Sequence, residues 1–199
     1  DGDGIPDSQE ISDDPTGLTL TEVQFGDDST SFEVTNNADQ GISLDGVFLC
    51  IPTCVALPDG LILLPGEILV IHTGEGVDGP GEIFLGPAAD QLVVVGGEVV
   101  LSTSETPTAA SLLDYVAWGE VIPLYEAEAA NSGQWQAGTF IYVDSLQPGD
   151  SLAHNGEDAP NASSWDIHSA PSTGAPNPDC GDGIGCRESR CDDNGDDDS

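Results

Sequence analysis

The sequence has almost no positive charge. Lys and Arg together number 2 against 37 Asp and Glu, which gives a formal net charge of −35, and the two cations are Arg187 and Arg190 near the C-terminus. Ion pairs between side chains elsewhere can therefore involve only histidine. Nucleic acids and anionic membranes are bound through Lys and Arg, so we expect neither as a partner. Concentrated salt or divalent cations are the expected sources of neutralisation.

Methionine and long apolar runs are also absent. The first residue is Asp1 and the chain contains no Met, so we expect either a processed product or a piece of a longer polypeptide. No apolar run approaches the roughly 18 residues that a membrane-spanning helix needs, so we expect no membrane insertion. Helical periodicity is confined to LYEAEAANSG, residues 124–133, which predicts one or two helical turns ending at Gly133.

Short runs rich in Val, Ile, Thr and aromatic residues fill the middle of the chain, and Gly, Pro, Asn and Asp separate them. Such runs predict β-strands, and their natural arrangement is two packed antiparallel sheets. Gly96 and Gly97 predict a two-residue hairpin turn with positive φ angles, and the alternation in SFEVTN predicts a half-exposed strand. The predicted strands are LTLTEVQF, SFEVTN, GVFLCI, EILVIHT, QLVVV, EVVLSTS, LLDYVAW and TFIYV.

Composition divides the chain into three segments. Residues 1–16 are rich in Asp, residues 17–178 hold nearly all the apolar side chains, and residues 179–199 are rich in Cys, Gly and Asp. Only the middle segment can bury a core. The sequence therefore predicts one all-β domain between two acidic segments.

Several motifs of the middle segment resemble the lamin tail domain of bacterial and archaeal secreted proteins. They are LTEV, SFEVTNNADQGISLDGVFL, LPDGLILLPGEILVI, GGEVVLS, LLDYVAWG and SAPSTGAPN, in that order. The resemblance implies an immunoglobulin-like antiparallel β-sandwich found in secreted and cell-surface proteins, and it implies no catalytic residues. Two departures are Val47, where the family usually has an aromatic residue, and the insertion CIPTC. Nuclear lamin relatives bind DNA and chromatin. We do not expect this role here, because the middle segment contains no Lys or Arg.

Five cysteines lie in two clusters, CIPTC and CGDGIGCRESRC. They indicate an oxidising compartment; a zinc site is the alternative, but neither cluster has a histidine nearby. The second cluster is similar to the C-G-N-G repeats of secreted bacterial surface proteins, and that pattern implies the pairs Cys180–Cys191 and Cys50–Cys54. We expect Cys186 to be the fifth cysteine, either free or joined to another chain.

The opening stretch DGDGIPDSQE matches a calcium-binding loop that lacks only its first ligand. Joining the final DDDS to this stretch supplies that ligand from Asp198, although two Asp-rich ends produce such a match by composition alone. Thrombospondin type 3 repeats and dockerin loops resemble this spacing. The predicted ligands of the loop are Asp1, Asp3, the carbonyl of Ile5, Asp7, Glu10 and Asp198. Alternate spacing predicts a second calcium ion at Asp192, Asn194 and Asp196.

Other candidate sites have plainer explanations. The stretch GEGVDG, residues 74–79, fits G-x-G-x-x-G but is followed by Pro80 instead of a helix, so a loop is expected. The three tryptophans are expected in the core. Glu22 and Glu33 lie in predicted strands without a cation, and backbone amides or an ion remain their alternative partners. The histidines, His72, His154 and His168, are too scattered to predict a catalytic base.

These features predict a structural role over a catalytic one. The leading hypothesis is an extracellular, calcium-binding module that assembles head to tail with copies of itself, either as tandem repeats of a longer polypeptide or as a polymer of separate chains. The assembly would be a surface filament, appendage or adhesin stalk. The alternative is an accessory binding domain that recognises a surface glycan or protein. We expect no enzymatic activity, because no nucleophile, base and oxyanion donors come together in the sequence. The acidic surface also suggests a saline habitat.

Overall fold

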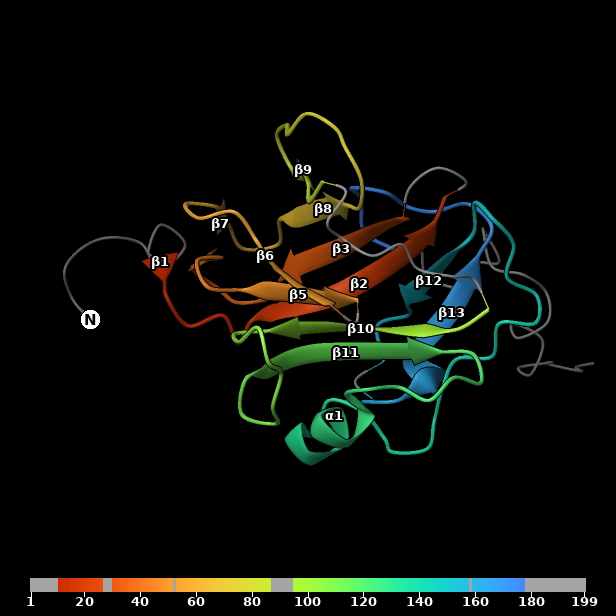
Figure 1. Cartoon of the computed structure of the whole chain (residues 1–199). Coiled ribbons are helices and arrows are strands. Elements are labelled where there is room, and N and C mark those ends of the chain that lie inside the picture. The colour runs from red at the N-terminus through yellow and green to blue at the C-terminus, as the bar shows by residue number, and fades with distance from the viewer. Residues whose placement is uncertain (1–10, 27–29, 52, 87–94, 158, 178–199) are drawn as a thin grey trace, which may run out of the picture.

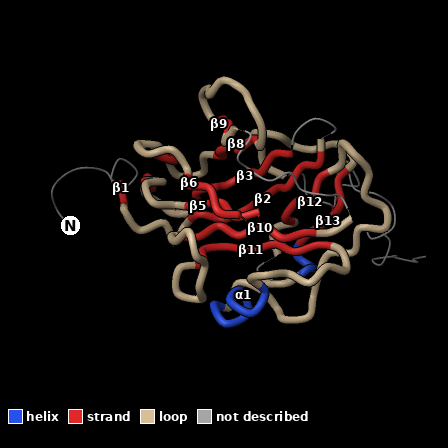
Figure 2. The backbone as a smooth tube through the Cα atoms, in the orientation of Figure 1, coloured by secondary structure: helices blue, strands red, loops and turns tan. Residues whose placement is uncertain are grey.

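The computed structural model describes residues 11–26, 30–51, 53–86, 95–157 and 159–177. Their regular secondary structure is mostly β-strand, with one short α-helix, and the strands are arranged in three sheets (Figure 1; Figure 2). The prediction of an all-β fold is confirmed at this level. None of the described helices is both long and apolar enough to cross a membrane.

The largest sheet has six strands in the order β13-β12-β2-β3-β8-β9. All neighbours are antiparallel except β8 and β9, which are parallel. Its central strands, β2 and β3, are the most buried. The strands are β2 (Leu18–Phe25), β3 (Thr30–Asn36), β8 (Ile68–His72), β9 (Glu82–Phe84), β12 (Ser151–His154) and β13 (Trp165–His168).

A four-stranded antiparallel sheet has the order β11-β10-β5-β6, and its strands β10 and β11 lie below β2 and β3 in the view of Figure 1. A small third sheet, β1-β4-β7, lies at one end. The four strands are β5 (Phe48–Ile51), β6 (Thr53–Ala56), β10 (Gly97–Ser102) and β11 (Leu112–Trp118), and the three are β1 (Ile11–Ser12), β4 (Gly41–Ser43) and β7 (Ile62–Leu63).

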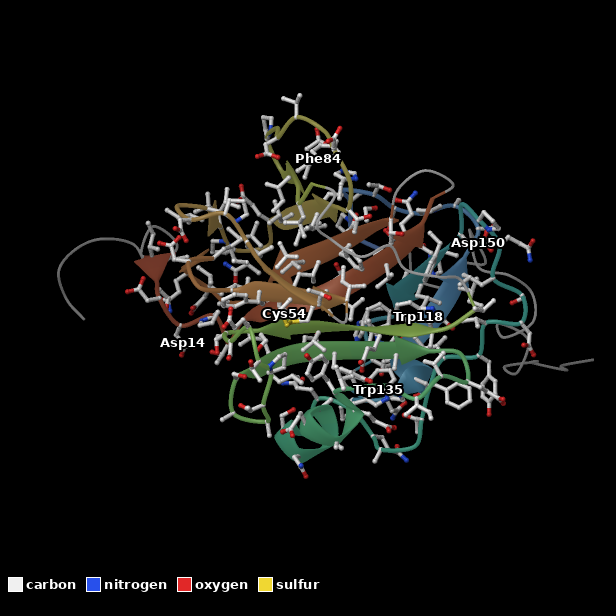
Figure 3. The ribbon with its side chains drawn as sticks, viewed as in Figure 1. Asp14, Cys54, Phe84, Trp118, Trp135 and Asp150 are labelled. Carbon is white, nitrogen blue, oxygen red and sulfur yellow. A yellow bond between two sulfur atoms is a disulfide. The ribbon has the colours of Figure 1, made fainter. Side chains whose placement is uncertain are left out.

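The two larger sheets share one hydrophobic core. Phe25 of β2 meets Trp118 of β11 edge to face, with ring centroids 5.4 Å apart. Trp135 lies between β11 and the helix α1 (Glu126–Ser132), as Figure 3 shows, and its ring contacts Tyr115 at 5.4 Å. Trp118, Trp135 and Trp165 are all buried, which confirms that the tryptophans belong to the core.

A β-bulge in β2 decides which of its side chains enter the core. Leu20 pairs with Val34 of β3 while Glu22 pairs with Glu33, so Thr21 is the extra residue. Because one inserted residue reverses the alternation of a strand, Val23 joins Leu20 in the core and Glu22 faces the other way. The sequence LTLTEVQF carries this bulge as a break in its alternation.

The face that carries Glu22 is covered by the chain itself. Residues 169–177, which we call the C-terminal strap, follow β13 and bond to β2, β3 and β12 through Ser172, Gly174 and Asn177. The expectation that SFEVTN is half exposed is therefore wrong. Of the seven residues of β3, only Thr35 is not fully buried.

Two other local expectations are also wrong. Neither Gly96 nor Gly97 has a positive φ; a Cβ at Gly96 would lie 2.4 Å from Cγ1 of Val121, so close packing requires the glycine. The run TFIYV forms no strand, because only Ile141 pairs with β11, at Trp118, before the chain turns.

Two expectations are confirmed. Helix α1 ends at Gly133, whose φ of 83° is the left-handed conformation of a helix C-cap. Cys50 and Cys54 are directly opposite in the hairpin of β5 and β6 and form a disulfide, near the label Cys54 in Figure 3.

Asn36, in the E-V-x-N motif, joins three chain segments. Its Nδ2 donates to the carbonyls of Gln40 and Leu63 at 2.8 and 2.7 Å, and its Oδ1 accepts from the N–H of Ala38 at 2.8 Å. We predict that Asn36→Ala lowers the free energy of unfolding by about 2–4 kcal/mol, because buried backbone groups lose their partners.

Urea denaturation measures this loss. The control is Asn37→Ala, which removes an exposed side chain that donates to Thr19 and should cost less than about 1 kcal/mol. Equal losses in the two variants would contradict the role given to Asn36.

Candidate binding groove and buried carboxylates

Most of the predicted calcium and disulfide residues lie outside the described residues. They are Asp1, Asp3, Ile5, Asp7, Glu10, Asp192, Asn194, Asp196, Asp198, Cys180 and Cys191. The calcium sites and the second disulfide therefore stay predictions. Within the described ranges, no three His, Cys, Asp or Glu side chains gather as a metal-binding group.

An open groove of about 950 Å³ lies where β2, β3 and β11 meet the loop after β12. Its volume is within the range of small-ligand sites. Hydroxyl and amide side chains dominate its polar lining, and three large aromatic residues form part of its wall. The lining includes Thr19, Thr21, Thr35, Asn37, Asp114, Tyr115, Gln134, Trp135, His154, Asn155, Glu157, Asn161, Trp165 and Asn177.

Several groove side chains are held by one another. Asn37 donates to Thr19 at 2.7 Å, and the hydroxyls of Thr21 and Thr35 lie 3.2 Å apart. Asn161 accepts from the N–H of Ser163 at 2.7 Å and caps the short 3₁₀ helix η2 (Ala162–Ser164). The groove lining contains no Lys or Arg, so its chemistry suits neutral hydroxyl groups better than anions.

Asp114 braces the two larger sheets beside the groove. Its carboxylate accepts from the N–H of Leu20 in β2 and from the N–H of Tyr115, each at 2.7 Å. Burial raises the pKa of Asp114 to about 7, although the two N–H groups act in the opposite direction. The bond to Leu20 lies immediately before the bulge at Thr21 and fixes the bulge against β11.

Glu98 is a second structural carboxylate. It accepts from the hydroxyl of Tyr115 at 2.9 Å and from the N–H groups of Leu124 and Tyr125 at 2.6 and 3.1 Å. Burial, followed by the charge of Glu98, raises the pKa of Tyr115. Glu98 thus holds the start of α1 against β10.

Glu22 and Glu33 lie side by side under the C-terminal strap and are 1% and 2% exposed. Glu22 accepts from the hydroxyls of Ser151 and Ser172 and from the N–H of Ser172. Glu33 accepts from the N–H of Gly174 through Oε1, while its Oε2 is buried without a hydrogen-bond partner. Of the two alternative partners expected for these carboxylates, backbone amides or an ion, backbone amides supply part of the hydrogen bonds.

The residue types of a hydrolytic triad meet under the strap, but in a different arrangement. Ser151 and His168 are paired across β12 and β13, and both are at most 1% exposed. The Ser151 hydroxyl donates its hydrogen bond to the Glu22 carboxylate and not to the imidazole of His168. Burial lowers the pKa of His168. This arrangement braces the sheet and does not present a nucleophile to solvent.

The stretch GEGVDG forms the loop between β8 and β9, as expected. A Cβ at Gly76 would lie 2.2 Å from the ring of Phe84, so the glycine is required by packing. Asp78 accepts from the N–H of Phe84 at 2.8 Å. His72 stacks on Phe84 at 4.4 Å and lies 3.4 Å from Glu82. These contacts close the loop on itself and leave no phosphate-binding turn.

The groove and the carboxylate pair were not predicted as sites. One sequence signal did exist, because Glu22 and Glu33 are charged residues in otherwise apolar strands without a Lys or Arg to pair with. The covering strap comes from 141 to 150 residues away along the chain, and no local pattern indicates that contact.

Comparison with protein-family models and with curated proteins finds no match to this chain.

Glu33 makes the stability of the protein depend on pH. Burial, with a smaller contribution from the charge of Glu22, raises its pKa from 4.5 to about 7. As the pH rises, Glu33 ionises in the unfolded chain before it ionises in the folded protein. The contribution of Glu33 to the free energy of unfolding is therefore fully present below pH 4.5 and is lost as the pH rises to about 7. We predict that Glu33→Gln is more stable than the wild type by about 1–3 kcal/mol at pH 8 and shows a flatter profile between pH 4.5 and 7.

Denaturation in EGTA across this pH range tests the prediction. Glu120→Gln removes an exposed carboxylate and controls for the change in net charge. A Glu33→Gln profile parallel to that of the wild type would show that Glu33 does not titrate in this range.

Proposed function

We propose that this protein is an extracellular structural module whose acidic ends bind calcium and join copies head to tail. The observation that supports this proposal is the division of the acidic residues between the body and the two ends of the chain. Inside the body, Glu22, Glu98 and Asp114 accept hydrogen bonds from donors of the same chain, so the body is braced from within. The Asp-rich ends have the spacing of calcium-binding loops.

The proposed fold is an immunoglobulin-like β-sandwich of the lamin tail type. Support comes from the shared core of the two larger sheets and from the motif residues. Asn36 of E-V-x-N, Glu98 of G-G-E-V and Asp114 of L-L-D-Y each hold backbone groups in place. A family motif made of such contacts would preserve a fold and would need no active site.

An extracellular location is proposed from the disulfide. Cys50 and Cys54 close a hairpin, and disulfides persist mainly in oxidising compartments. We further propose that the module is not catalytic, since Ser151 donates to Glu22 beneath the strap. A rigid β-body with joinable ends suits a surface filament, appendage or adhesin stalk.

Calcium should control assembly of the full chain. In excess calcium we predict higher-order assemblies, and in EGTA single chains, because the loop ligands repel one another without a cation. Size-exclusion chromatography with light scattering measures the mass. Asp3→Asn combined with Glu10→Gln should prevent assembly, while Glu105→Gln combined with Asp144→Asn, at exposed positions of the body, should not.

Mixing two variants gives a sharper test of head-to-tail joints. An Asp3→Asn chain keeps a functional C-terminal ligand, and an Asp198→Asn chain keeps a functional N-terminal loop. Each variant alone should remain monomeric, and the mixture of the two in calcium should form dimers and no larger assemblies. Masses that are independent of calcium, or long assemblies from either variant alone, would contradict the proposed joint.

A second candidate function is glycan binding, which the groove favours. Gln134 lines the groove, whereas Gln136 is exposed and does not. We predict that a neutral oligosaccharide binds there, that heparin does not, and that Gln134→Ala weakens binding about 3- to 10-fold through loss of one hydrogen bond.

Calorimetric titration with cello-, chito- and xylo-oligosaccharides measures this affinity, with Gln136→Ala as the matched control. If no neutral oligosaccharide binds, or if Gln134→Ala binds as well as the wild type, the groove is not a glycan site.

A further inference from the structure

Glu22 and Glu33 are two buried carboxylates on neighbouring strands. The two residues are directly opposite on the antiparallel strands β2 and β3, on the face turned away from the core. Both side chains are more than nine-tenths buried, at 1% and 2% exposure. Side chains opposite one another in such a pair lie about 5 Å apart at Cβ, and like charges there are destabilising.

The hydrogen-bond donors around Glu22 and Glu33 leave one carboxylate oxygen without a partner. Glu22 has three hydrogen bonds from Ser151 and Ser172, but Glu33 Oε2 is buried with none. His168, on the neighbouring β13, is the imidazole near Glu22. The sequence places Lys or Arg only at positions 187 and 190, so no such side chain among the described residues reaches the pair.

A buried carboxylate oxygen without a hydrogen-bond partner, such as Glu33 Oε2, is costly, and a second carboxylate beside it increases the cost. We propose that a calcium ion binds between Glu22 and Glu33 under the C-terminal strap, with Glu33 Oε2 as one of its ligands. Two carboxylates balance a divalent charge, and calcium accepts hydroxyl, amide and carbonyl oxygens in addition.

Neutral oxygens are available at the same place. Ser172 and Asn177 of the strap are bonded to each other at 2.7 Å, and Gln24 of β2 accepts from Thr173 at 2.8 Å. No third His, Cys, Asp or Glu completes a metal-binding group among the described residues. The remaining ligands are therefore neutral oxygens of the strap and of β2, and water.

Such an ion ties the strap to the sheet. Glu33 bonds to the N–H of Gly174, and Glu22 bonds to that of Ser172, so a cation on the two carboxylates also fixes the two strap amides. The inference does not rest on the proposed function, because all of its ligands lie in the body and none at the acidic ends.

Hydrogen exchange of the strap amides tests the site in the full chain. At pH 8 we expect calcium, compared with EGTA at equal ionic strength, to slow exchange in residues 169–177 about tenfold or more. Glu33→Gln should abolish this effect of calcium. Gln keeps the acceptor for Gly174 and removes a buried charge, so the variant should remain folded.

Two controls isolate the body site from the ends. Asp3→Asn with Glu10→Gln should leave the calcium effect on the strap intact, and so should Glu120→Gln. Exchange that is unchanged by calcium would overturn the proposal, as would protection that persists in Glu33→Gln. Equal protection by sodium chloride would also overturn it, since the site would then take a monovalent ion.

Discussion

The hydrogen bond from a backbone N–H to a buried carboxylate is the interaction on which this structure depends. A chain with 37 acidic residues and 2 basic ones cannot hold its body together with ion pairs. Instead, Asp114 ties β11 to β2 and Glu98 holds the start of α1. Charge-assisted bonds of this kind are stronger than neutral ones. Asp114 and Glu98 therefore brace the body from within.

The bulge at Thr21 determines where one set of these braces lies. Without the extra residue, Glu22 would point into the shared core and Val23 would face outward. Asp114 accepts the N–H of Leu20 just before the bulge, and Asn177 of the strap donates to the carbonyl of Thr21. The irregular strand is thus held from both sides, and the groove and the carboxylate pair both form beside it.

The sequence predicted the parts of the fold that local pattern determines. Runs rich in β-branched and aromatic residues located β2 and β11 to the residue, and Gly133 located the end of α1. The short strands β12 and β13 were missed, because four residues with polar flanks carry little periodicity. Burial of Glu33 could not be predicted, since it comes from Gly174 far along the chain. Likewise, the sequence predicts a turn at Gly96, whereas the side chain of Val121 is what lies close to this glycine in the structure.

Internal braces leave one electrostatic problem unsolved. Burial raises the pKa of only a few carboxyl groups, Glu33 and Asp114 among them, so most of the formal net charge of −35 remains after folding. Copies of the protein therefore repel one another over a Debye length of about 10 Å at 0.1 M salt. A surface of this kind disfavours self-association unless a cation is shared between two chains. A divalent ion at a joint removes repulsion and supplies attraction at the same place. This requirement, more than the shape of the body, is the physical reason to look for calcium wherever two acidic segments of this protein meet.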